Sequence, residues 1–275
     1  MRESSNPAFS SLTQTVARGT AGVQGYGQQQ YDADYGNPFQ SQAQVHQRAM
    51  TVDDVVSKTG ITLAVIVVGA IINFFIATNV STNLAMILTI VGAIGGLITV
   101  LVSTFGKKFG SAAVTLTYAA FEGLFIGGVS FMFTATIQGV SATTLILQAV
   151  LATVGVFAGM LWVYKSGAIR VTPKFTRFMT AAIIGVLVLA VGNLLLALFA
   201  GYSPLRDGGP LAIIFSLVCI ALAAFSFLLD FDQADKLVRA GAPANYAWGV
   251  ALGLAVTLVW LYVEILRLLS YFNRD

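Results

Sequence analysis

Apolar runs of about 20 residues alternate with short polar breaks from Gly60 onward. An α-helix rises about 1.5 Å per residue, so each run can cross about 30 Å of hydrocarbon. The breaks contain glycine, proline and charged residues, which are typical of turns. The sequence therefore predicts an all-α, polytopic membrane protein, a bundle of seven transmembrane helices. The predicted spans are about 60–78, 83–105, 111–136, 144–165, 177–201, 210–231 and 247–271.

The composition excludes a soluble domain. Only 10% of the residues are charged and 57% are hydrophobic, whereas a soluble domain carries about 25% charged residues because its surface must face water. A single cysteine, Cys219, excludes a disulfide within the chain and a cysteine-based zinc site, and a single histidine, His46, excludes a site with several histidines.

Residues 1–58 differ from the rest of the chain. They are polar and rich in Gln, Gly and Tyr between Gly22 and Gln47, so they bury too little apolar surface to offset the entropy of ordering. We predict a disordered tail there, with a short interfacial helix near 50–58 that Thr51 caps at its N-terminus. Residues 59–275 then form the transmembrane domain.

The lysine and arginine residues predict the orientation of the bundle. If the chain has seven spans, 12 Lys and Arg residues fall on one side, in the tail and in the second-to-third, fourth-to-fifth and sixth-to-seventh links. Three fall on the opposite side. Because cytoplasmic loops are enriched in Lys and Arg, we expect the N-terminus in the cytoplasm and the C-terminus outside. This asymmetry explains the net charge of +3, so nucleic acid is not an expected partner.

Glycine pairs spaced four residues apart recur inside the spans. Such pairs let two helix backbones approach closely in lipid, and we expect them to pack helices within one molecule. The pairs are Gly92 with Gly96, Gly123 with Gly127, Gly155 with Gly159, and Gly249 with Gly253.

Few carboxyl groups lie at membrane depth, and they are the candidate functional residues: Glu122, Glu264, Asp230 and Asp232. A carboxylate at the bilayer centre costs about 2.5–3.5 kcal/mol, so it must face the interior, pair or be protonated. Interior carboxyls can therefore sense protons, and their oxygens suit Ca²⁺, for which Asp230 and Asp232 are the candidate ligands. The structural alternatives are a neutral, hydrogen-bonded Glu122, a local pair of Glu264 with Arg267, and a solvated helix end at Asp230 and Asp232.

No catalytic pattern accompanies these carboxyls. The spans contain neither a histidine base nor a lysine away from their ends, and the seventh span has no aspartate to pair with Asp230 or Asp232. The sequence also lacks a nucleotide-binding glycine loop. We therefore expect that the protein is not an enzyme.

Several segments together resemble the Bax inhibitor-1/YccA family. They are Tyr118-Ala-Ala-Phe-Glu-Gly-Leu-Phe-Ile-Gly127, Leu229-Asp-Phe-Asp232 and Leu258-Val-Trp-Leu-Tyr-Val-Glu-Ile-Leu-Arg267. The stretches Asn6-Pro-Ala-Phe9 and Met50-Thr-Val-Asp-Asp54 resemble its actinobacterial-type branch. The resemblance covers about residues 50–275 and the short motif in the tail.

The resemblance implies a plasma (inner) membrane protein whose last helix lies near the centre of the bundle, and a pH-sensitive calcium leak. In such proteins two aspartates, one ending the sixth span and one in the seventh, share a proton and close the pore. The first corresponds to Asp230 or Asp232. Counting back from Leu266 and Arg267 places the second at Thr257, so Glu122 is the candidate for the second carboxyl.

We therefore expect a cation leak, with Ca²⁺ as the transported ion and no bound cofactor, that protonation of interior carboxyls gates. The alternative is a non-channel regulatory membrane protein that modulates a membrane protease or an envelope stress response. The expected partners are membrane lipid and, for the alternative, a membrane protease or another membrane protein.

Overall fold

The computed structural model describes residues 48–106, 108–135 and 141–273. Within these ranges the chain forms long α-helices and one short 3₁₀-helix, η1 (Ala244–Tyr246), with no β-strand. The long helices are α2 (Val52–Asn79), α3 (Thr82–Phe105), α4 (Ala112–Ala135), α5 (Ala142–Ser166), α6 (Pro173–Ala200), α7 (Pro210–Arg239) and α8 (Ala247–Phe272). All seven are long and apolar enough to cross a membrane. The predicted all-α, seven-span bundle is confirmed.

The helix ends differ most from the prediction at two places. Thr51 caps α2 as expected, since its hydroxyl accepts a hydrogen bond from the Asp54 amide at 3.2 Å. However, α2 continues without a break to Asn79, so residues 52–58 are its first two turns and not a separate helix. Helix α7 runs on to Arg239, about two turns past the predicted end of its span. The predicted disorder of the tail concerns residues 1–47, which lie outside the described residues.

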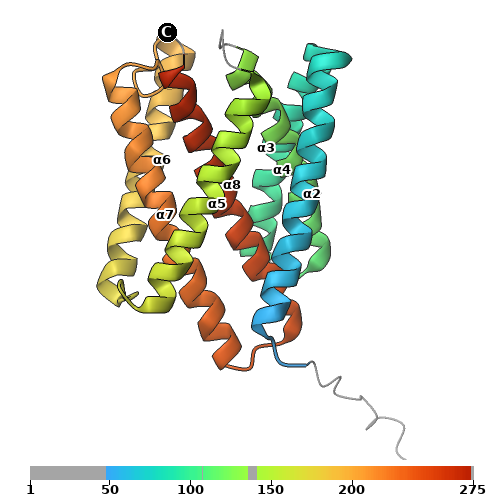
Figure 1. Cartoon of the computed structure of the whole chain (residues 1–275), viewed down its shortest axis with the longest axis vertical. Helices are drawn as coiled ribbons and strands as arrows, with labels where there is room; N and C mark the ends of the chain where they lie inside the picture. The colour runs from blue at the N-terminus through green and yellow to red at the C-terminus, as the bar shows by residue number, and fades with distance from the viewer. Residues whose placement is uncertain (1–47, 107, 136–140, 274–275) are drawn as a thin grey trace, which may run out of the picture. The chain divides into compact units, whose positions relative to one another are not determined.

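Helix α8 passes between α2, α3 and α4 on one side and α5, α6 and α7 on the other (Figure 1). In its apolar window 83% of the residues are buried, against 6% in α6, which faces outward. The last helix therefore lies at the centre of the bundle, as expected.

Glycines bring α2 and α3 against α4. A Cβ atom at Gly123 would lie 2.6 Å from the carbonyl oxygen of Ile66 on α2, and one at Gly92 would lie 2.5 Å from the carbonyl oxygen of Phe121. Asn73 adds polar contacts across the same three helices, donating to Thr89 Oγ1 at 3.0 Å and to the Leu124 carbonyl at 2.6 Å. The pairs at Gly92 and Gly123 therefore pack helices within the molecule, as predicted.

The other two glycine pairs behave differently. A Cβ at Gly155 or Gly159 would have no atom within 4 Å, so the prediction that this pair packs a helix is wrong. The pair lies on the outward side of α5, where glycine is tolerated without a neighbour. Gly249 packs against the ring of Phe109, and Gly253 lies opposite Asp230, where a Cβ would be 4.0 Å from Oδ1.

The segment before α2 is joined to the connection between α7 and α8. Ala49 and Pro243 form an isolated antiparallel bridge, and the amide of Met50 donates to the carbonyl of Ala242 at 2.7 Å. The ammonium group of Lys58 donates to the carbonyl of Ala244. These contacts fix the end of the bundle at which α8 begins.

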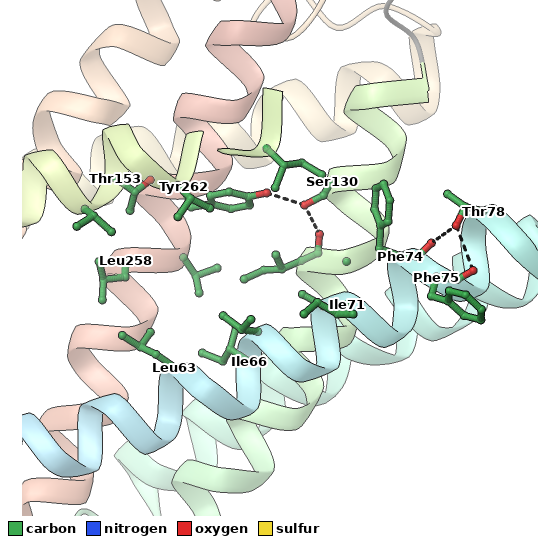
Figure 2. A pocket seen from close by; sticks show the side chains of 18 of the residues that line it. Leu63, Ile66, Ile71, Phe74, Phe75, Thr78, Ser130, Thr153, Leu258 and Tyr262 are labelled. Atoms are coloured by element: carbon green, nitrogen blue, oxygen red, sulfur yellow. Dashed lines mark hydrogen bonds between the residues drawn. The ribbon is translucent and has the colours of Figure 1, made fainter. Parts of the chain in front are cut away.

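An opening lies between α2 and α5. It has a volume of about 600 Å³ and is lined almost entirely by apolar side chains, including Ile71, Phe74 and Leu258. Two of the lining side chains, Ser130 and Tyr262, are hydrogen-bonded to each other, with their oxygens 2.8 Å apart (Figure 2). We refer to this opening as the apolar groove.

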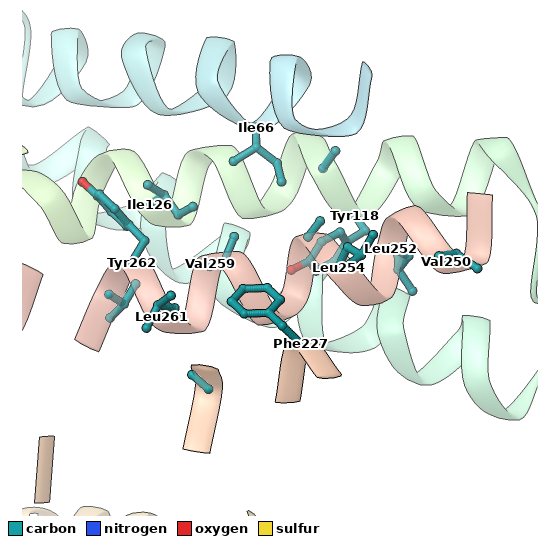
Figure 3. Packing of buried hydrophobic residues seen from close by; sticks show 14 of the residues in the cluster. Ile66, Tyr118, Ile126, Phe227, Val250, Leu252, Leu254, Val259, Leu261 and Tyr262 are labelled. Atoms are coloured by element: carbon teal, nitrogen blue, oxygen red, sulfur yellow. The ribbon is translucent and has the colours of Figure 1, made fainter. Parts of the chain in front are cut away.

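The hydrophobic core surrounds α8 on all sides. Leu252, Leu254 and Leu261 of this helix are buried, and they pack with Tyr118 and Ile126 of α4 (Figure 3). On the other side Phe227 of α7 stacks on Phe231, with ring centroids 6.0 Å apart. Hydropathy does not by itself place a helix at the centre of a membrane bundle, since α6 is more apolar than α8 and the less buried of the two. The central position instead shields the polar residues Thr257, Glu264 and Arg267 of α8 from lipid.

Candidate functional site

Asp230 on α7 meets Thr257 on α8. The hydroxyl of Thr257 donates a hydrogen bond to Asp230 Oδ2 at 2.7 Å. The two helices are antiparallel neighbours: Asp230 precedes the end of α7 by about 13 Å and Thr257 follows the start of α8 by about 15 Å, so they share one depth. Thr257 is buried, Asp230 is partly buried, and Gly253 leaves room for the carboxyl group.

Asp232 points elsewhere. Its carboxylate pairs with Lys236 one turn further along α7 at 2.5 Å, and Asp235 pairs with Arg239 in the same way at 2.9 Å. Both cations are exposed, so these are surface pairs of small energetic weight. Residues two apart on a helix face different directions. Of the two aspartates, Asp230 therefore contacts α8, whereas Asp232 pairs within its own helix.

Glu122 lies midway along α4 and lines a different space. Its neighbours are the hydroxyl of Tyr118, one turn earlier, and Gly96 of α3, where a Cβ would lie 2.9 Å from Oε2. Because Gly96 has no side chain, α3 leaves room there for the carboxyl group of Glu122. Glu122 is half-buried.

Glu122 borders a cavity of about 560 Å³ between α3 and α6, with α4, α7 and α8 behind it; we call it the α3–α6 cavity. Val256 and Val259 of α8 also line it. Neither Thr257 nor Asp230 lines this cavity, although Val256 directly precedes Thr257 on α8. In the described residues Asp230 has no hydrogen bond to Glu122 or to any other carboxyl group.

Glu264 and Arg267 form the pair that their spacing predicts. Glu264 Oε1 and Arg267 Nη1 are 2.6 Å apart, and the two residues are 3% and 6% exposed. The guanidinium of Arg267 also lies over the ring of Phe133, 5.6 Å from its centroid. Both residues line the α3–α6 cavity at its other end, toward the end of α8.

Arg206 was not among the candidate functional residues predicted from the sequence. This residue lies in the connection between α6 and α7 and borders the α3–α6 cavity together with Glu264 and Arg267. The protein atoms around its guanidinium lower the pKa of Arg206, and so does repulsion by Arg267, whereas Glu264 opposes both effects. An arginine stays charged despite such a change.

A resident metal centre is not formed by the side chains in the described ranges. No group of three or more His, Cys, Asp or Glu residues there is arranged to hold an ion. Asp230 and Asp232 were predicted to bind Ca²⁺, but they contact different residues, Thr257 and Lys236. Asp230, Glu122 and Glu264 instead have separate partners: Thr257, Tyr118 and Arg267.

The comparisons with known proteins agree with the architecture. A family model described as Bax inhibitor 1 like matches residues 6–274. No curated protein matches the chain.

Proposed function

The chain belongs to the Bax inhibitor 1 like family, and from that premise we propose that it is a pH-sensitive cation leak, with Ca²⁺ as the transported ion. Family membership and seven apolar helices make it a multi-pass membrane protein. The proposal places the gate at Asp230 and Thr257. It requires no cofactor and no enzymatic activity.

The observation that carries the proposal is the hydrogen bond of 2.7 Å between Thr257 and Asp230. It joins α7 to the central helix with a group that changes charge on protonation. A cation loses hydrating water when it enters the bundle, and an ionised Asp230 partly replaces that stabilisation. A neutral Asp230 does not, so protonation favours a closed pathway.

The single aspartate with a threonine partner differs from the proton-sharing pair of aspartates that the resemblance implies. In this chain Asp230 is therefore the proton-sensitive group of the gate. Glu122 is a separate carboxyl group at membrane depth, beside Tyr118 and Gly96 in the α3–α6 cavity.

The direct test is ion flux into proteoliposomes that contain the full chain. We expect Ca²⁺ flux to fall as the pH is lowered, because protonation removes the charge of Asp230. Asp230→Asn should lower the flux at neutral pH about tenfold and abolish most of its pH dependence. Asp232→Asn is the matched control, since its carboxylate pairs with an exposed lysine, and it should leave both properties unchanged.

Equal flux in the wild type and in Asp230→Asn at every pH would reject the leak. Removal of residues 1–47 distinguishes the alternative, a regulatory protein that acts on a membrane protease or an envelope stress response. This deletion leaves the contact of Met50 with Ala242 in place. Loss of the cellular effect on deletion, with no effect of Asp230→Asn, would favour the regulatory function.

For the location, we propose the plasma membrane with the start of α2 in the cytoplasm. The basis is the positive charge at one end of the bundle. Alternating helix directions put four cations at the same end as Arg48: Lys108 and Arg170 in connections, Lys174 in the first turn of α6 and Lys236 in the last turn of α7. Cytoplasmic ends of membrane proteins carry such an excess.

A further inference from the structure

The α3–α6 cavity opens onto the surface that faces lipid. Leu97 of α3 and Leu187 of α6 both line the cavity, yet they are 61% and 60% exposed. Each helix has its own partner, α3 packing on α4 and α6 on α7. The walls between them are therefore accessible from the side, and they are apolar.

The end of this cavity near the α6–α7 connection is polar and carries more positive than negative charge. The guanidinium groups of Arg206 and Arg267 face it with only the carboxylate of Glu264 beside them. Arg267 is already paired with Glu264. Asp207, the neighbour of Arg206, accepts a hydrogen bond from the Gly209 amide within the connection. Arg206 is exposed at the mouth of the cavity and forms no ion pair of its own among the described residues.

Glu264 also has a free acceptor at this end. Its Oε1 binds Arg267, but its Oε2 has no hydrogen-bond partner although the residue is only 3% exposed. A buried oxygen of this kind is costly unless a donor reaches it. The cavity thus presents the unpaired guanidinium of Arg206, the unpaired acceptor of Glu264 and, leading away from both, an apolar space between α3 and α6.

We propose that the α3–α6 cavity binds an anionic phospholipid with a hydroxylated headgroup, of the phosphatidylglycerol class. The acyl chain lies between α3 and α6, the phosphate pairs with Arg206, and a headgroup hydroxyl donates to Glu264 Oε2. This ligand supplies the negative charge and the donor that the cavity lacks. The volume of about 560 Å³ is within the range of small-molecule sites, about 300–1,000 Å³.

Glu122 lies at the opposite end of the cavity, beside Tyr118 and Gly96, so it does not compete with the phosphate for Arg206. A bound lipid would fill the space between the two ends. This inference goes beyond the leak itself, and its test measures binding without any flux.

The test is native mass spectrometry of the full chain in detergent. Phosphatidylglycerol, phosphatidylethanolamine and phosphatidic acid with identical acyl chains are added separately. We expect phosphatidylglycerol to be retained best, because phosphatidylethanolamine brings its own ammonium cation beside Arg206 and Arg267, and phosphatidic acid lacks the glycerol headgroup whose hydroxyls would reach Glu264. Equal or better retention of either competitor would overturn the proposal.

Two pairs of variants locate the site. Arg206→Gln should weaken retention of phosphatidylglycerol about tenfold, whereas Arg170→Gln, at the other end of the bundle, should not change it. Ala190→Phe fills the apolar part of the cavity and should also displace the lipid, whereas Ala181→Phe, at an exposed position outside the cavity, should not. Equal losses in a variant and its control would show general surface binding and overturn the proposal.

Discussion

At the scale of single residues, the hydroxyl of Thr257 is the only side-chain donor that the described residues give to Asp230. A hydrogen bond from a neutral donor to a carboxylate stabilises the ionised form. Thr257 therefore contributes to the pH range over which the proposed gate responds, together with the burial of Asp230, even though it does not titrate.

Thr257→Val tests this role. The change keeps the shape of the side chain and removes the donor, so the ionised Asp230 loses stabilisation of about 1.5–3 kcal/mol at most. We expect the pH at which half of the flux is lost to rise, measured by Ca²⁺ flux in proteoliposomes. Thr257→Ser keeps a hydroxyl and is the control. An unchanged midpoint in Thr257→Val would show that the hydrogen bond does not tune Asp230.

Part of this arrangement could be predicted from the sequence. Spacing alone predicted the contact of Glu264 with Arg267, because residues three apart share a face of a helix. It left Asp230 and Asp232 equivalent, since the rotation of α7 depends on how that helix packs against α8. The unpaired Arg206 could not be predicted, because a residue in a connection gives no periodic signal of what it faces.

At the scale of helices, close approach depends on where a glycine points. Gly123 lies against the backbone of α2, whereas Gly155 has nothing within 4 Å of its Cβ position. The two residues belong to the same sequence motif, so the motif alone does not predict packing. What distinguishes them is that α4 packs against two helices of its own half of the bundle, while this side of α5 faces outward.

Gly123→Ala and Gly155→Ala form a matched pair of variants. At Gly123 the new methyl group would meet the Ile66 carbonyl at 2.6 Å, so we expect a loss of about 1–3 kcal/mol in stability from overpacking. At Gly155 we expect a change within about 0.5 kcal/mol, or a slight gain from helix propensity. Thermal unfolding in detergent measures both. Equal effects would contradict the packing of α2 on α4.

At the scale of the whole molecule, the number and order of the helices followed from hydropathy, because each span must satisfy its own backbone in lipid. The position of the last helix came from the resemblance to the family and not from hydropathy. The α3–α6 cavity and the apolar groove could not be predicted, since each is bounded by helices far apart in the sequence.

The orientation of the bundle gives a prediction at this scale. Asn79 and Ser166 are exposed and lie at opposite ends of the bundle, at the end of α2 and at the end of α5 (Figure 1). In intact cells we expect Asn79→Cys to react with a membrane-impermeant maleimide, and Ser166→Cys to react only after lysis. The native Cys219 is 1% exposed and serves as the unreactive background. The reverse pattern would invert the proposed topology.

The burial of α8 among the other six spans has a consequence for biogenesis. Chains emerge from the ribosome N-terminus first, so the segment that fills the middle of this bundle is synthesised after the six spans that surround it. Until α8 inserts, the earlier spans lie in the bilayer without their common partner. A premature stop codon before or within α8 would therefore leave an incomplete bundle for quality-control proteolysis.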